Sequence, residues 1–140
     1  MNTNIATTKA QSQRLLRCGV PAESADMCRT HFESDGQKYE QLGVMDEYAY
    51  EYASLNPIPA WSLSALLGLI PHTIEVDDDT ECYFCLAKDY PASEDYSAAY
   101  LECWSFEHES VARIRDKSPI EACVQLIEWL TENGYKLNKI

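Results

Sequence analysis

The sequence predicts an α+β fold, in which a small antiparallel sheet of three or four strands packs against N-terminal, central and C-terminal helices. Two observations carry this prediction: a strongly amphipathic helical pattern closes the chain, and short apolar runs separated by turn residues precede it. The connections between these runs are too short for the crossovers of a parallel sheet. With 140 residues, of which 46% are hydrophobic, the chain fits one domain over 1–140, and we expect 1–9 and 136–140 to be flexible.

The N-terminal part predicts two short helices. The first covers 10–17, with Leu15 and Leu16 facing inward, and it ends at the glycine and proline of 18–21. The second covers 22–31.

The next stretch contains turn chemistry and an ambiguous segment. Residues 34–36, Ser-Asp-Gly, are typical of a turn. In 39–54 the tyrosines alternate with alanine and glutamate. The alternation favours a strand, whereas alanine and glutamate favour a helix, and we expect a strand or extended segment.

The middle of the chain predicts a helix followed by a meander. The helix covers 60–70, with apolar residues at Leu63, Leu66, Leu67 and Ile70. Gly68 costs it about 1 kcal/mol relative to alanine, which suggests close packing or a weak last turn. The expected strands are 72–76, 81–88 and 99–106, and 111–115 is either a fourth strand or a loop.

The closing helix, 118–134, carries its own start and stop signals. Ser118 is placed to accept a hydrogen bond from the amide of Glu121, whose side chain can reach back to the Ser118 amide. Pro119 suits a first helical position, and Gly134 can take the left-handed conformation that ends a helix. Trp129 lies beside the narrow polar strip, so we expect it at the rim of the core.

The net charge of −12 excludes several classes of partner. Nucleic acids and anionic membranes are bound by Lys and Arg, so we expect neither as a partner. No run approaches the roughly 20 apolar residues of a membrane helix, and residues 1–13 lack the apolar stretch of a secretory signal. We therefore expect a cytoplasmic protein with reduced cysteines.

Acidic residues are concentrated in 75–109, where a single base, Lys88, interrupts them. Aromatic residues lie among these acids, and tyrosine and tryptophan are enriched in protein interfaces, although they are also ordinary sheet residues. This composition predicts an acidic and aromatic face that binds another protein. Its negative charge favours a basic protein as the partner. Its candidate residues are Asp77, Asp78, Asp79, Glu81, Glu94, Asp95, Tyr96, Glu102 and Trp104.

We found no convincing reaction centre or cofactor site. Cys82 and Cys85 form a CxxC pair that Cys103 and His108 could complete as a zinc site, but residues three apart in a strand point to opposite faces. Residues 75–81 could offer oxygens to a hard cation, but they lack the glycine and the distal glutamate of a calcium loop. We expect core cysteines, a solvated turn, scattered surface histidines and no cofactor.

Two stretches, 58–71 and 118–134, resemble small uncharacterised proteins of Bacteroides-type gut bacteria, their prophages and their mobile elements. The resemblance includes the order of the parts: a Trp-Ser-Leu helix, an acidic β region and a closing helix. It implies a phage or mobile-element context, and it assigns no catalytic or binding residues.

These observations leave three hypotheses. The first is a non-enzymatic protein that binds another protein and inhibits or modulates a host or defence system, since an acidic face can imitate nucleic-acid phosphates. The alternative is a small-molecule or nucleotide-binding module with an aromatic pocket between sheet and helices. The third, a metal-dependent enzyme, requires a bound ion.

Overall fold

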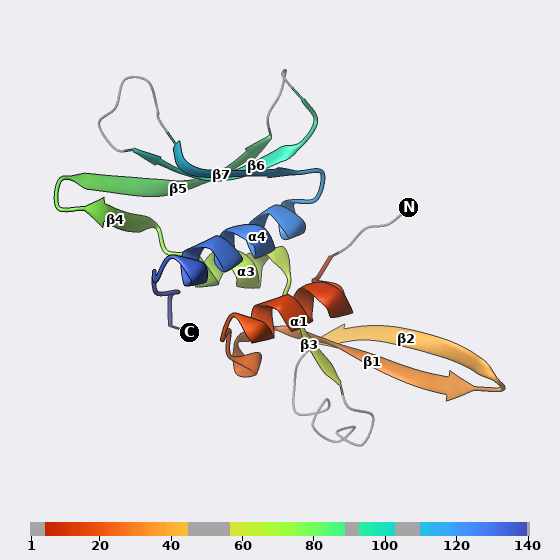
Figure 1. Cartoon of the computed structure of the whole chain (residues 1–140). Coiled ribbons are helices and arrows are strands. Elements are labelled where there is room, and N and C mark those ends of the chain that lie inside the picture. The colour runs from red at the N-terminus through yellow and green to blue at the C-terminus, as the bar shows by residue number, and fades with distance from the viewer. Residues whose placement is uncertain (1–4, 45–56, 89–92, 103–109, 140) are drawn as a thin grey trace. The chain divides into compact units, whose positions relative to one another are not determined.

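The computed structural model describes residues 5–44, 57–88, 93–102 and 110–139 (Figure 1). It confirms the α+β class, because helices accompany two antiparallel sheets of three and four strands. The chain divides into two compact units, Met1–Ala65 and Leu66–Ile140, and each is described by itself below. The single domain over 1–140 stays a prediction.

The first unit holds a three-stranded sheet in the order β2-β1-β3. Its elements are α1 (Lys9–Arg17), the short 3₁₀ helix η1 (Ala22–Ser24), β1 (Met27–Ser34), β2 (Gln37–Val44) and β3 (Ile58–Ala60). A capping box between Thr8 and Gln11 starts α1, which packs against β3. Of the two leucines expected inward, Leu15 is fully buried, but Leu16 is exposed.

The helix expected over 22–31 is wrong. Only η1 is helical there, and β1 follows and pairs with β2 from Met27↔Val44 to Ser34↔Gln37. The two turn residues, Asp35 and Gly36, both have positive φ angles, 53° and 75°. A two-residue turn of this kind matches the twist of a β-hairpin, so it selects strands where the local sequence alone allows a helix. Of the segment expected to be extended, 39–44 is strand and 45–54 lies outside the described residues.

Trp61 organises the core of the first unit. Its side chain is fully buried, its backbone amide donates to Thr7 Oγ1 (3.0 Å), and its indole Nε1 donates to Ser24 Oγ (3.0 Å). The Arg29 guanidinium donates to the carbonyls of Ala6 and Thr7. The segment just before α1 is therefore held by specific hydrogen bonds.

The central helix is shorter than expected. β3 occupies Ile58–Ala60, and α3 covers Leu63–Leu69. Ser62 Oγ accepts from the Ala65 amide, and the Asp26 carboxylate accepts from both the amide and the hydroxyl of Ser62. The buried residues of this helix are Leu66 and Leu69, whereas Leu67, expected inward, is exposed.

The second unit holds a four-stranded antiparallel sheet in the order β4-β5-β6-β7, and α4 packs against β6 and β7 (Figure 1). The bounds are β4 (Thr73–Asp77), β5 (Thr80–Lys88), β6 (Tyr96–Glu102), β7 (Ser110–Asp116) and α4 (Pro119–Glu132). The expected strands 72–76 and 81–88 are confirmed as elements, and 111–115 is a strand rather than a loop. Of the expected strand 99–106, residues 99–102 belong to β6, which starts earlier than expected, and 103–106 lies outside the described residues.

Helix α4 contributes more buried hydrophobic residues to the described part of the second unit than any other element. Ser118 Oγ accepts from the Glu121 amide (3.2 Å), as expected, but the Ser118 amide donates to Asp116 Oδ1 (2.9 Å) rather than to Glu121. Gly134 has a φ of +79°, and the Tyr135 amide donates to the Leu130 carbonyl, which closes the helix as a Schellman motif. Its buried residues are Ile120, Ala122, Cys123, Val124, Leu126, Ile127 and Leu130.

An aromatic cluster lies between the sheet and α4. The Tyr100 ring lies 5.9 Å from Phe84 and 6.3 Å from Trp129, which stacks on Tyr135 at 5.5 Å. The Tyr100 hydroxyl donates to the Pro71 carbonyl (2.7 Å), and burial raises the pKa of this phenol. Trp129 is half-buried, as a rim position predicts.

Candidate functional site

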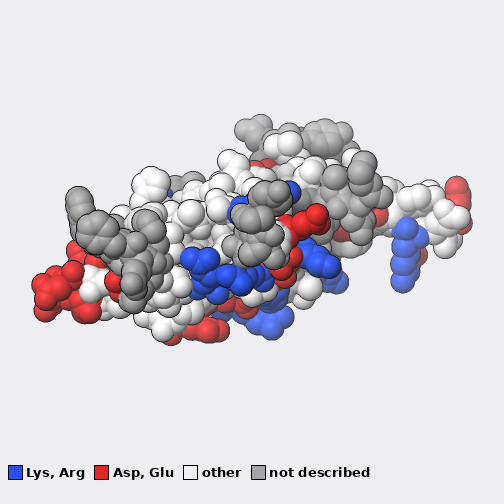
Figure 2. Space-filling model, turned by 90° about the horizontal axis from the view of Figure 1, so that it is seen from above, with Lys and Arg blue, Asp and Glu red and all other residues white. Residues whose placement is uncertain are grey.

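The acidic turn, which we define as 75–81, is the strongest charged feature of the second unit. It joins β4 to β5, and every acid in it is exposed: Glu75, Asp77, Asp78, Asp79 and Glu81. Glu75 lies directly opposite Glu81 in the ladder, an arrangement that destabilises a hairpin because like charges repel. Figure 2 shows acidic side chains gathered at the left end of the view, where Figure 1 places this turn.

The turn is ordered by Asp77. Its Oδ1 accepts the amide of Asp79 (3.0 Å), and the ladder is irregular between Glu75 and Asp77. Hydrogen bonds from the Thr80 side chain and then from the Asp79 amide lower the pKa of the Asp77 carboxyl. The carboxylate is therefore ionised at neutral pH and holds Asp79 and Thr80 in place.

The other candidate residues do not all join the acidic turn. Glu102 ends β6 opposite Cys82, at the end of the ladder nearest the turn, but it shares the face of the buried Cys82 side chain and not that of Glu81. Tyr96 begins β6 opposite Lys88, at the far end of the β5–β6 ladder. Cys82 and Lys88, which mark the two ends, are six residue steps apart along β5, which is about 20 Å at 3.3 Å per residue.

The expected nine-residue face is therefore split. Glu94 and Asp95 directly precede Tyr96 and share its end of the sheet, where Lys88 Nζ lies 5.5 Å from the Tyr96 ring. Trp104 lies outside the described residues. The acidic turn forms one group, Glu102 lies on the other face of the same end of the sheet, and the far end of the ladder forms a group of mixed charge.

The face of the sheet opposite α4 also carries basic residues. Arg113 and Arg115 are exposed on β7, and their cross-strand partners are Ala99 and Ser97. Alternation along the strand puts them on the face away from Tyr100, so the sheet runs from an acidic edge strand, β4, to a basic edge strand, β7.

The cysteine pair is not a chelate. Cys82 is fully buried and pairs with Glu102, whereas Cys85, three residues on, pairs with Ala99 on the other face. Cys103 and His108 lie outside the described residues, and within the described ranges no group of three His, Cys, Asp or Glu residues could hold a metal ion. Burial raises the pKa of the Cys123 thiol to about 12, so it is unreactive at neutral pH.

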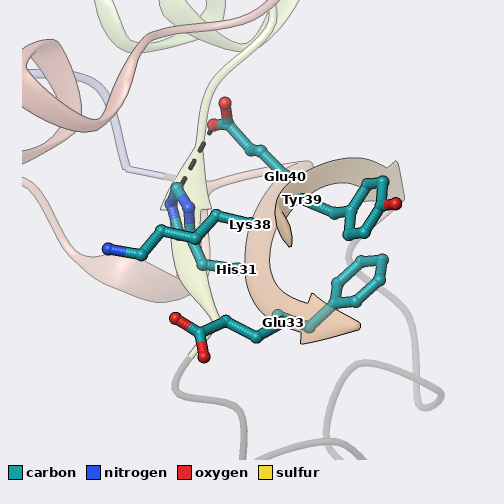
Figure 3. Close-up of a pocket in the computed structure, with 6 residues that line it drawn as sticks. His31, Glu33, Lys38, Tyr39 and Glu40 are labelled. Carbon is teal, nitrogen blue, oxygen red and sulfur yellow. Dashed lines mark ion pairs between the residues drawn. The ribbon is translucent and has the colours of Figure 1, made fainter. Parts of the chain in front are cut away.

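A hollow of about 670 Å³ lies on the β1–β2 hairpin, which sequence reasoning missed (Figure 3). His31 Nε2 lies 4.0 Å from Glu40 Oε1, which also accepts from Arg29 (3.1 Å). Phe32 and Tyr39 stack at 5.4 Å. The Asp-Gly turn was the signal that could have found this hairpin.

Comparisons with known proteins returned no relative: no family model, no curated protein and no solved structure matches the chain. Among the described residues, no helix has both the length and the apolar character that crossing a membrane requires.

Proposed function

We propose that this chain is a non-enzymatic protein of a phage or mobile element, that it works in the cytoplasm of a bacterial host, and that it binds a basic protein there and modulates it. The contact surface in this proposal is the acidic turn. The resemblance of 58–71 and 118–134 to mobile-element proteins motivates the setting.

The observation that carries the proposal is the juxtaposition of Glu75 and Glu81. Two exposed carboxylates directly opposite each other cost stability, and three consecutive aspartates extend the same charge into the turn. A basic partner would offset this repulsion, and complementary charge also speeds association and selects the partner. Val76 is 37% exposed within the turn and adds an apolar contact to it.

The test is affinity capture from a bacterial host lysate with two matched double variants. Asp78→Asn/Asp79→Asn removes two charges from the turn and leaves Asp77 to hold it. Glu23→Gln/Glu132→Gln removes two exposed charges elsewhere. We expect the wild type and the control to retain a basic protein that the turn variant loses. Retention of the same proteins by the turn variant would count against the proposal.

The hollow on the hairpin supports a second candidate, a small-molecule or nucleotide site. His31 and Lys38 offer donors on one face of the hairpin, where Glu33 and Glu40 disfavour an anion, and Phe32 and Tyr39 offer rings for stacking on the opposite face. This candidate site lies on a hairpin, whereas the sequence led us to expect a pocket between sheet and helices. Thermal shift against a nucleotide panel tests it, and no shift at about 1 mM ligand would eliminate it.

A further inference from the structure

The distal half of the β1–β2 hairpin projects without a core of its own. Every residue from His31 to Gln41 is exposed, and β3 covers β1 only up to Arg29. A two-stranded ribbon with both faces in water is marginally stable by itself. The stacked pair Phe32–Tyr39, on one face, is 37% and 43% exposed, which is unusual for large aromatic rings.

β2 is the outer strand of its sheet, and its sequence is self-complementary. The segment Gln37-Lys38-Tyr39-Glu40-Gln41 has amides at both ends and opposite charges on either side of a central tyrosine. When two copies run antiparallel about Tyr39, Lys38 of each lies opposite Glu40 of the other. Gln37 then lies opposite Gln41, and the two Tyr39 rings are neighbours.

We propose that β2 pairs with β2 of a second copy of this chain, about a two-fold axis at Tyr39, and so joins two three-stranded sheets into one. Such an isologous contact buries the same patch on both copies. It extends the Phe32–Tyr39 stack into a row of four rings on one face, and it places two Lys38–Glu40 pairs on the other.

The backbone of β2 has the polarity that this pairing needs. In a two-residue hairpin the residues flanking the turn, Ser34 and Gln37, exchange hydrogen bonds, and such pairs then alternate along the ladder. The N–H and C=O groups of Gln37, Tyr39 and Gln41 therefore point towards β1. Those of Lys38 and Glu40 point outward, where a Lys38–Glu40 pairing between copies requires them.

β3 supports this assignment of the backbone groups. By the same alternation Cys28 points towards β2, so Cys28↔Pro59 must be a position at which β1 and β3 exchange no hydrogen bond. Proline has no N–H, and it fits such a position without loss. The adjacent pairs, Met27↔Ala60 and Arg29↔Ile58, then carry the hydrogen bonds.

Charge decides which partner fits β2. Lys38 makes no ion pair with any described residue, and the Glu40 carboxylate meets Arg29 and His31 through Oε1. A second copy supplies a carboxylate to Lys38 and an ammonium to Glu40 at the same time. A uniformly acidic strand could form an ion pair with Lys38 alone, and a uniformly basic strand with Glu40 alone.

The contact is expected to be weak. A pairing of five residues buries less than the roughly 1,200 Å² of a stable interface, and two chains of charge −12 repel each other. The measurement is therefore sedimentation velocity of the full chain from about 10 µM to about 1 mM, at about 0.15 M salt, where this repulsion is largely screened. The wild type is expected to shift towards twice the monomer mass.

Charge reversal gives the decisive comparison. Lys38→Glu alone and Glu40→Lys alone each place like charges opposite one another, and both are expected to stay monomeric. An equal mixture of the two restores both ion pairs and is expected to dimerise. Lys117→Glu, at an exposed position in the second unit, is the matched control and is expected to behave as wild type.

A backbone variant makes the test independent of charge. Lys38→Pro removes an amide that points outward, so it leaves the β1–β2 ladder intact and is expected to abolish the dimer. Circular dichroism checks that each variant is folded. A wild type that stays monomeric at 1 mM would overturn the proposal. So would a dimer that survives Lys38→Pro, or folded single variants that remain monomeric when mixed.

Discussion

Two buried serines differ in whether the side-chain hydroxyl has a hydrogen-bond partner, and this decides what each contributes to stability. Ser12 Oγ shares a hydrogen bond of 2.8 Å with Thr7 Oγ1 in the core of the first unit. Ser97 Oγ is buried in β6 and has no hydrogen-bond partner in the part of the chain that the structure describes. A buried hydroxyl without a partner retains its desolvation cost, whereas loss of a buried bond leaves the other hydroxyl unpaired.

We predict opposite effects for alanine at these two sites. Ser97→Ala is expected to leave the free energy of unfolding unchanged or to raise it by about 1 kcal/mol, and Ser12→Ala is expected to lower it by about 1–3 kcal/mol. Urea denaturation measures both. A larger loss at Ser97 than at Ser12 would show that the Ser97 hydroxyl is satisfied.

Asp77 predicts a pH dependence of stability at the acidic turn. Its folded pKa is below the ordinary value of 3.8. Its contribution is therefore fully present above about pH 4 and is lost as the pH falls below 3.8 through the folded value. The difference in melting temperature between wild type and Asp77→Asn should be largest near pH 6 and should shrink towards about pH 2.5. A difference that grows on acidification would contradict this role.

At the scale of elements, two glycines make a matched pair. Gly134 ends α4 with a φ of +79°, a conformation that a side chain strains. Gly68 lies inside α3, and nothing comes within 4 Å of a Cβ built there, so the close packing suggested by the sequence is not its reason. Its carbonyl accepts from Asn138 Nδ2 (3.1 Å), a bond that alanine would keep.

We predict that Gly68→Ala stabilises the protein by about 0.5–1 kcal/mol and that Gly134→Ala destabilises it by about 1 kcal/mol. Thermal unfolding followed by circular dichroism compares the two variants directly. A destabilising Gly68→Ala would mean that the end of α3 depends on glycine for another reason.

How well the sequence predicted an element depended on where the element's stability comes from. α4 was predicted nearly to the residue because its signals are local: Ser118, Pro119 and Gly134 mark its ends. β1 was predicted as a helix because its strand form depends on pairing with β2, which no local propensity reports. Leu16 and Leu67 lie on the apolar stripe that helical spacing predicts, but their side chains are exposed. Each helix has more apolar residues in this stripe than the neighbouring elements cover.

The candidate site was predicted in part. The sequence located the acidic turn, since Asp77, Asp78 and Asp79 are consecutive. It could not show that Tyr96 lies at the opposite end of the β5–β6 ladder, because that follows from register. The hairpin hollow was missed for the same reason: His31 and Glu40 meet only through pairing of β1 with β2.

At the scale of the whole molecule, charge is distributed in a way that the net value of −12 conceals. The second unit has an acidic turn at β4–β5 and exposed arginines on β7, and the first has a hairpin whose charges balance about Tyr39. Each unit thus carries its own candidate interaction surface. In our proposals the acidic turn binds a basic protein, and β2 binds a second copy of the chain.

The central claim is that the acidic turn recognises its partner through charge. The most direct measurement is the affinity of the captured protein for wild type, for Asp78→Asn/Asp79→Asn and for Glu23→Gln/Glu132→Gln, by calorimetry at about 0.05 M and about 0.3 M salt. Wild type and the control should lose affinity as salt rises, and the turn variant should bind at least about tenfold more weakly with a smaller salt effect. Equal affinity and equal salt dependence for all three would contradict the claim.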